Sequence, residues 1–547
     1  MNTRDCVKMN CGKGFARVAA MAVMAVLFTA GAAQASSYTN IASGSWTDSA
    51  TWNTSGIGIS ASDTIIVFNP TATDNSTNDN AGAFSLNQLR IVPNQIVNLY
   101  SSGDSSLSFE NSGAMITNAG NSALTLNTPI TLAADLKVGS SSTAAGIITI
   151  NNSIAGTGNM VFASPGAAIT CASVNNSGSI IHRSGGNGLA LNLTTVGSNV
   201  TNVTLYARAP LTITTLAVNS NGTSLNHNES ISGNLTVTNT TGTGNLTLKH
   251  NGTYNAAVNK ILLTGSVNHT GAITNSGTGT GNVEINGNIG ANVTAVVQDS
   301  ANSLLVLNGA NTFSGGVTIK AGKAWLKSDP TPGGSGTVRL GDTGGSSSAT
   351  LQIFNVAKTL ANPIVLGTTS GTLSIESGFA SSITGGVTGT NNLTVKQGGA
   401  NTLTFKTGSL NFSGALINAG SAGSVVSSSV IGSNVTAVVQ NSTSSTLILS
   451  GTNFYTGTTT VSLGTLETKN KNCLSADSSV VIASGGPKMY LNFTGTNTIT
   501  SLKLGSSNMA KGVYGASALS PEYFTVGGTG ALNVLKGPAN GTCIRFF

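Results

Sequence analysis

The sequence predicts an all-β fold in which short strands wind into a parallel β-solenoid. Residues 292–298 return unchanged at 434–440, so a strand–turn unit has been copied along the chain. Apolar residues alternate with Thr, Ser or Asn in short runs bounded by Gly, Asn and Ser, which is the pattern of strands and turns. Charged residues make up only 7% of the chain, against about 25% in a typical domain. Repeated units without long insertions favour stacked coils, and a sandwich or barrel is the alternative.

The first 35 residues have the three parts of a secretory signal. A basic start is followed by an apolar run over 18–30 and by Ala33-Gln34-Ala35, which predicts cleavage between Ala35 and Ser36. The run is too short for the roughly 20 residues that a membrane-spanning helix needs. We therefore expect an exported mature chain without a transmembrane segment. The segment holds +3 of the formal net charge of +7.

The chain after the signal divides by the regularity of its pattern. Trp46 and Trp52 precede the apolar run Ile65–Phe68, and we expect the two tryptophans to fill the core of an N-terminal cap that covers the first coil. We predict a signal peptide at 1–35, the cap and first coils at 36–100, degenerate coils at 101–290, coils with two clear repeats (about 292–327 and 434–469) at 291–475, C-terminal coils at 476–535 and a tail at 536–547.

The two clear repeats share a detailed pattern of positions. Each has a Leu-x-Leu strand, Gly-x-Asn, an aromatic residue, Gly after Thr or Ser, a β-branched strand and a closing Gly. At the fixed offset of 142, the first set aligns with the second: Leu305, Leu307, Gly309, Asn311, Gly315 and Gly322 with Leu447, Leu449, Gly451, Asn453, Gly457 and Gly464.

This pattern resembles the autotransporter-associated β-strand repeat of bacterial passenger domains. The resemblance implies an exported protein that forms a right-handed parallel β-helix and sits on, or leaves, the bacterial surface. A complete autotransporter also ends in a membrane barrel with alternating strands and aromatic girdles. Residues 290–547 keep the Gly/Ser/Thr composition of the rest, so no translocator barrel is recognisable here, although the chain ends in Phe546-Phe547. A truncated passenger without independent function is therefore one alternative.

Few residues have the spacing of a catalytic or metal site. Four histidines follow the signal, no two within ten residues, and no HExxH or Cys/His ligand spacing occurs, so we predict no metal and no cofactor; solvent-facing or ladder histidines are expected. Cys171, Cys473 and Cys543 are odd in number and far apart, unlike a disulfide framework. The histidines are His182, His227, His250 and His269.

A β-helical carbohydrate-active enzyme, a polysaccharide lyase or hydrolase, is the second alternative. Such chemistry uses paired acidic groups, or Asp with Lys or Arg, and no acids of the mature chain are adjacent. Asp329 and Asp342 flank a Pro/Gly-rich segment that is the best candidate for a protruding loop, and an ordinary solvated turn accounts for the same residues.

The sequence thus predicts a secreted or surface-displayed structural or adhesive protein rather than an enzyme. Its abundant Asn, Thr and Ser side chains suit a long polar face for weak multivalent contact. We expect glycans, matrix or neighbouring cell surfaces as partners. We expect no nucleic acid partner, since Lys/Arg clusters and interleaved aromatics are missing.

Overall fold

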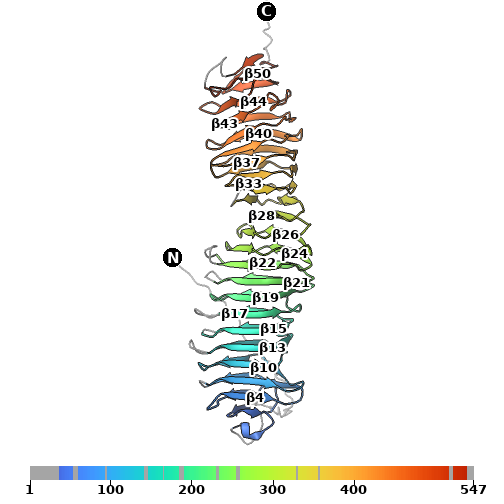
Figure 1. The fold of residues 1–547 in the computed structure, drawn as a ribbon, viewed down its shortest axis with the longest axis vertical. Helices are drawn as coiled ribbons and strands as arrows, with labels where there is room; N and C mark the ends of the chain where they lie inside the picture. Colours follow the sequence, from blue (N-terminus) through green and yellow to red (C-terminus); the bar gives the residue numbers. More distant parts are fainter. Residues whose placement is uncertain are drawn as a thin grey trace, which may run out of the picture.

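The chain winds into a long rod of about 18 stacked turns, with the sequence running from one end to the other (Figure 1). This confirms the predicted all-β parallel solenoid and excludes the sandwich and the barrel, because the coil-to-coil ladders are parallel. The computed structural model describes residues 36–52, 59–92, 95–140, 146–163, 166–183, 190–228, 233–253, 259–327, 331–354, 358–515 and 522–538.

A first ladder of parallel strands forms one side of the rod. It continues beyond its last strand through single bridges at Leu410 and Ile431. In order, its strands are β1 (Ser37–Asn40), β3 (Ile65–Phe68), β6 (Gln88–Ile91), β9 (Ala114–Asn118), β12 (Leu136–Ser140), β14 (Met160–Phe162), β16 (Ile180–His182), β18 (Asn202–Leu205), β20 (Thr223–His227), β22 (Leu246–His250), β24 (Gly271–Asn275), β26 (Val293–Asp299), the first half of β28 (Val317–Leu326), β29 (Val338–Leu340), β32 (Ile364–Leu366) and β35 (Val387–Gly389).

A second ladder forms another side and runs almost the full length of the rod. Its strands are β2 (Gly44–Ser45), β4 (Asp74–Asn78), β7 (Val97–Ser101), β10 (Leu124–Asn127), β13 (Ile148–Gly156), β15 (Ile169–Asn176), β17 (Leu191–Val196), β19 (Leu211–Val218), β21 (Leu235–Gly242), β23 (Lys260–Leu263), β25 (Asn282–Ile285), β27 (Leu305–Leu307), the second half of β28, β30 (Ala349–Ile353), β33 (Leu373–Ser377), β36 (Leu393–Gln397), β38 (Gly414–Asn418), β40 (Val435–Asn441), β42 (Thr458–Leu463), β44 (Ser479–Ile482) and β47 (Ser501–Leu504).

Shorter ladders complete the coils. Near the N-terminal end, β5 (Ala83–Leu86), β8 (Ser106–Phe109) and β11 (Ile130–Leu132) stack beneath the second half of β13. In the C-terminal half a third ladder consists of β31 (Lys358–Leu360), β34 (Ser381–Ile383), β37 (Thr402–Phe405), β39 (Ser424–Ser427), β41 (Thr446–Leu449), β43 (Thr465–Thr468) and β45 (Lys488–Leu491).

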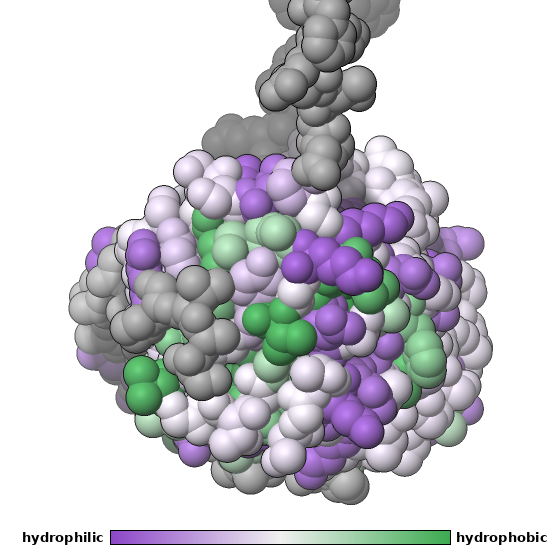
Figure 2. All heavy atoms as spheres, turned by 90° about the horizontal axis from the view of Figure 1, so that it is seen from above, coloured by the Kyte–Doolittle hydropathy of each residue, from purple (hydrophilic) through white to green (hydrophobic). Residues whose placement is uncertain are grey.

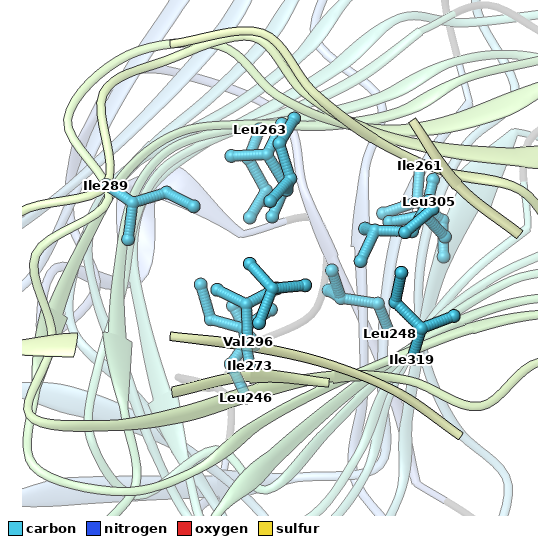
Figure 3. Packing of buried hydrophobic residues seen from close by; sticks show 14 of the residues in the cluster. Leu246, Leu248, Ile261, Leu263, Ile273, Ile289, Val296, Leu305 and Ile319 are labelled. Carbon is cyan, nitrogen blue, oxygen red and sulfur yellow. The ribbon is translucent and has the colours of Figure 1, made fainter. Parts of the chain in front are cut away.

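The core is built from columns of like side chains. Period-2 alternation sends every second residue of a strand inward, and parallel register places each apolar residue above its counterpart in the next coil. Figure 3 shows Ile261, Leu263 and Leu305 of the second ladder facing Ile273 and Val296 of the first. One such column, with no side chain more than 3% exposed, contains Val97, Leu124, Ile148, Ile169, Leu191, Leu211, Leu235, Ile261, Val283 and Leu305.

The N-terminal end of the core is closed by the two tryptophans. Trp46 is fully buried and Trp52 is 4% exposed. Their ring centroids lie 5.8 Å apart, and Trp46 also packs edge-on against Phe84 at 5.1 Å. The short helix η1 (Ser49–Thr51) carries the chain between them, and Trp52 Nε1 donates to the carbonyl of Trp46 at 3.1 Å. The expected burial is confirmed, although only part of the predicted cap lies among the described residues.

The C-terminal end changes its pairing. β48 (Ser507–Asn508) folds back antiparallel on β47, and β46 (Gly495–Ile499), β50 (Gly530–Val534) and β49 (Gly512–Tyr514) form a small separate sheet that includes an antiparallel pair. Viewed onto this end, the surface is a mosaic of hydrophilic residues with a few hydrophobic ones (Figure 2).

The described residues cover part of the predicted segments. The signal segment and most of the predicted tail lie outside the described residues. The ladders continue across the predicted divisions at 100/101, 290/291 and 475/476. η1 is the only helix in the described part of the chain, and none there is long and apolar enough to cross a membrane.

Candidate binding surfaces

The repeat signature residues make the same local contacts in the coils around 290–326 and 432–468, but on different ladders. β26 and β27 belong to the first and second ladders, whereas β40 and β41 belong to the second and third. β26 and β40 cover the identical residues at the offset of 142. Leu305 and Leu307 on β27, and Leu447 and Leu449 on β41, are all fully buried in the core. The Leu-x-Leu element is therefore the inward-facing side of one strand in each repeat.

The signature asparagine holds three successive coils together. Asn311 Oδ1 accepts from the backbone N–H of Ile289 at 2.8 Å, and its Nδ2 donates to the carbonyl of Pro332 at 2.7 Å. Asn453 makes the same pair of bonds, to Ile431 N at 2.9 Å and Cys473 O at 2.7 Å. Each side chain is nearly fully buried. Each amide thus satisfies backbone groups at a corner where the strand ladder is interrupted.

A buried amide–hydroxyl cluster, also duplicated, fixes the opposite corner. Asn275 Nδ2 donates to Gln298 Oε1 at 2.8 Å, and Gln298 Nε2 donates to the carbonyls of Ser300 and Ser303, each at 2.8 Å. The second copy reproduces every bond at 2.7–2.8 Å, with Asn418, Gln440, Ser442 and Ser445 as its members. Sequence reasoning missed this cluster, although Gln298 and Gln440 end the identical heptapeptides.

The six signature glycines are required by backbone packing. A Cβ at any of them would overlap a carbonyl oxygen of the preceding coil. Gly322 and Gly464 also have φ near +65°, a conformation that favours glycine. The overlapping pairs are Gly309 with Gly287, Gly451 with Ser429, Gly315 with Thr294, Gly457 with Thr436, Gly322 with Ser300 and Gly464 with Ser442.

Two uncharged columns run up the outer side of the second ladder, and we call them the hydroxyl face. Successive members are register partners in neighbouring coils, so they repeat at about 4.8 Å. All carry a hydroxyl or an amide, and all are half-buried or exposed. The first column is Thr125, Thr149, Thr170, Asn192, Thr212 and Thr236, and the second is Ser153, Ser173, Thr195, Thr215 and Asn239.

A groove of about 400 Å³ lies on the outer side of the first ladder, across β6, β9 and β12. Two exposed cations, Arg90 and Lys137, line it, together with Gln88 and Thr117. Its apolar lining includes Met115, Ala119, Ala163 and Val92, the last 49% exposed. None of the described residues that line the groove carries a carboxylate. Sequence reasoning did not single out these residues, because they are brought together only by the pairing of strands more than 20 residues apart.

The groove cations have no acidic partner. Among the described residues, ion pairs join Lys260 to Glu284, Lys323 and Lys396 to Glu376, and Lys469 to Glu467. Arg90 and Lys137 belong to none of these pairs. The groove therefore carries two uncompensated positive charges.

All four histidines are buried. His182, His227 and His250 lie in one inward column with Leu205, and the rings of His227 and His250 stack at 4.6 Å. Burial lowers the pKa of His182, of His227 and of His269 to about 4, and lowers the pKa of His250 as well. The expected ladder position is confirmed for the stacked pair, whereas the solvent-facing alternative is wrong.

The other candidate residues do not assemble into a site in the described part of the chain. No group of three or more His, Cys, Asp or Glu there could hold a metal ion. Cys171 and Cys473 are buried free thiols, and Cys543 lies outside the described residues. Asp342 accepts from the backbone N–H of Thr343 at 2.8 Å, while Asp329 is outside the described residues, so the pair is not tested.

The two repeats found in the sequence also match the model of a known protein family. Residues 304–323 and 444–467 match the passenger-associated-transport-repeat family. No curated protein and no solved structure matches the chain. The matched repeats and the parallel solenoid together fit a passenger-type repeat protein of the autotransporter kind.

Proposed function

We propose that the chain is an exported structural or adhesive protein, without catalytic activity, that acts on the cell surface or outside the cell. The passenger-type repeat supports export, because this repeat family implies a secreted or surface-exposed protein. The single observation that carries the adhesive role is the hydroxyl face. Its uncharged hydroxyl and amide groups repeat over at least five coils, which suits many weak, simultaneous contacts.

The proposed partners are glycans, matrix components or neighbouring cell surfaces. A regular row of hydrogen-bond donors and acceptors can contact a repeating polymer at several points. A compact small molecule can contact only one or two of these groups. Sequential weak contacts then give avidity that no single contact provides.

The enzyme alternative receives less support from the groove. Acid–base cleavage of a glycosidic bond needs two carboxyl groups within several ångströms of the bond, and the groove lining holds none. An enzyme would release soluble products from a polysaccharide incubated with the protein. A binding protein would retain the polymer unchanged.

Two experiments test the proposal. Fractionation of the host should place the mature chain, beginning at Ser36, in the medium or on the surface; confinement to the cytoplasm or periplasm would refute surface display and favour a truncated passenger. Purified Thr149→Glu/Thr212→Glu protein should then bind host cells and glycan arrays at least about tenfold more weakly than wild type. Thr247→Glu/Thr318→Glu, which places the same charges three coils apart on the first ladder, is the matched control.

A further inference from the structure

The groove across β6, β9 and β12 has the features of a built site for an anionic ligand. Both of its cations are exposed, and neither has an acidic partner within the part of the chain that the structure describes. An uncompensated cation pair attracts an anion and gains more from it than a cation already neutralised by a neighbouring carboxylate. The charge of the groove therefore defines the sign of its ligand.

The positions of the two cations define the size of the ligand. Lys137 is in register with Met115 and Gln88, whereas Arg90 lies two residues further along β6 and is in register with Thr117. Two strand spacings and a two-residue offset place their backbones about 12 Å apart. One small anion would meet only one of them closely, whereas a chain with repeated anionic groups offers a group to each.

The remaining lining defines the chemistry between the charges. Met115, Val92 and Ala163 give apolar contact, and the amide of Gln88 and the hydroxyl of Thr117 provide hydrogen-bonding groups beside them. A sugar ring presents C–H faces and hydroxyl edges of this kind. The lining residues that the structure describes include no aromatic side chain, so they offer no surface for the stacking of nucleobases on which single-stranded nucleic acid binding depends.

We propose that this groove binds an acidic polysaccharide whose sugars carry carboxylates, with Arg90 and Lys137 each facing one carboxylate. The groove runs across successive coils, and so the polymer lies along the rod. The biological role of this binding rests on the proposed surface location, because the protein would encounter acidic glycans at the cell surface or outside the cell. The binding itself is a property of the folded protein and can be measured without that location.

The test uses the full mature protein with polygalacturonate, its fully methyl-esterified form and free galacturonate as probes. We expect binding of polygalacturonate that weakens with salt, little binding of the ester, and weak binding of the monomer. Arg90→Gln and Lys137→Gln should each lower affinity about fivefold. Arg339→Gln, which removes an exposed cation elsewhere on the first ladder, should leave affinity unchanged. Far-ultraviolet circular dichroism and thermal midpoints verify that each variant is folded.

Several outcomes would overturn the proposal: no binding of polygalacturonate, equal binding of the ester, or an equal loss in Arg339→Gln. If poly-glutamate bound with the same affinity as polygalacturonate, charge alone would account for the binding, and the proposed preference for a polysaccharide would be refuted. The failure of the proposed function can be distinguished from the failure of the groove proposal. A protein confined to the cytoplasm can still bind polygalacturonate in this groove. Loss of cell binding in Thr149→Glu/Thr212→Glu, together with polygalacturonate binding that Arg90→Gln leaves unchanged, would refute the groove and keep the adhesive face.

Discussion

At the scale of single residues, the solenoid depends on buried amides that replace missing ladder bonds. The corners interrupt the strands, so their backbone groups need other partners. Asn311 and Asn453 each supply one acceptor and one donor there. Leaving such groups unpaired costs more than a hydrogen bond normally contributes.

Asn453→Ala should therefore destabilise the protein by about 2–4 kcal/mol, because two buried backbone groups lose their partners. The measurement is urea unfolding followed by circular dichroism, with hydrogen exchange to locate the loss near Ile431 and Cys473. Thr452→Ala, at the exposed neighbouring position, is the control and should stay within about 0.5 kcal/mol. An equal effect of the two substitutions would contradict the role of the amide.

The buried histidines predict a loss of stability in mild acid. Burial, together with the charge of the neighbouring His250, lowers the pKa of His227 to about 4, below its ordinary value of 6.5. Between these values the unfolded chain binds more protons than the folded one, so stability falls as pH falls from about 6.5 to about 4. A shift of this size corresponds to on the order of 3 kcal/mol for one ring.

The variant His227→Leu tests this, since Leu205 occupies the same column one coil earlier. The slope of unfolding free energy against pH between 6.5 and 4 should become shallower than in wild type. Lys249→Gln, on the neighbouring strand β22, leaves the histidine column intact and should leave the slope unchanged. A slope that is the same in His227→Leu and wild type would mean that the ring does not titrate on unfolding.

At the scale of elements, close backbone approach between coils explains why the repeats need glycine. Gly457→Ala should destabilise the protein by about 2–4 kcal/mol, because the new methyl group overlaps the carbonyl of Thr436. Gly398→Ala is the matched control, since its Cβ would find no atom nearer than 3.7 Å. Thermal unfolding of both variants measures the difference. Equal midpoints would show that the coils shift apart at little cost.

The strands, their repetition and a polar face could be predicted from the sequence, whereas the groove could not. Alternation placed Leu305 and Leu307 on one apolar-alternating strand because the signal lies within that strand, and both side chains are buried in the core. Arg90 and Lys137 line the same groove because β6 pairs with β9 and β9 pairs with β12. The register of these strand pairs depends on the length of each intervening coil. Those lengths vary: register partners in the third ladder are 22, 22, 19 and 23 residues apart, from Leu403 to Met489. An error of one residue reverses which side chains face outward.

At the scale of the whole molecule, stacking solves the problem of burial but leaves two open ends. Every coil contacts only its neighbours, so the first and the last coil present unpaired edges and apolar side chains. Trp46 and Trp52 cover the core at one end. At the other end, β48 pairs antiparallel with β47 and β49 pairs antiparallel with β50, which changes the exposed edge. These ends decide whether rods remain single or join end to end.

Trp46→Ala should therefore promote end-to-end association as well as lower stability. Removing the indole deletes contacts with Trp52, Phe68 and Phe84, a loss of about 3–5 kcal/mol for a buried Trp, and it uncovers the first coil. Analytical ultracentrifugation should detect species that are larger than those of the wild-type protein, and the fraction of these larger species should increase with protein concentration. Trp325→Ala separates the two effects, because Trp325 is half-buried on the side of the rod, where its indole donates to the carbonyl of Phe354. That control should lose stability without associating, and association of both variants would show that exposed apolar surface alone, rather than an open end, joins the rods.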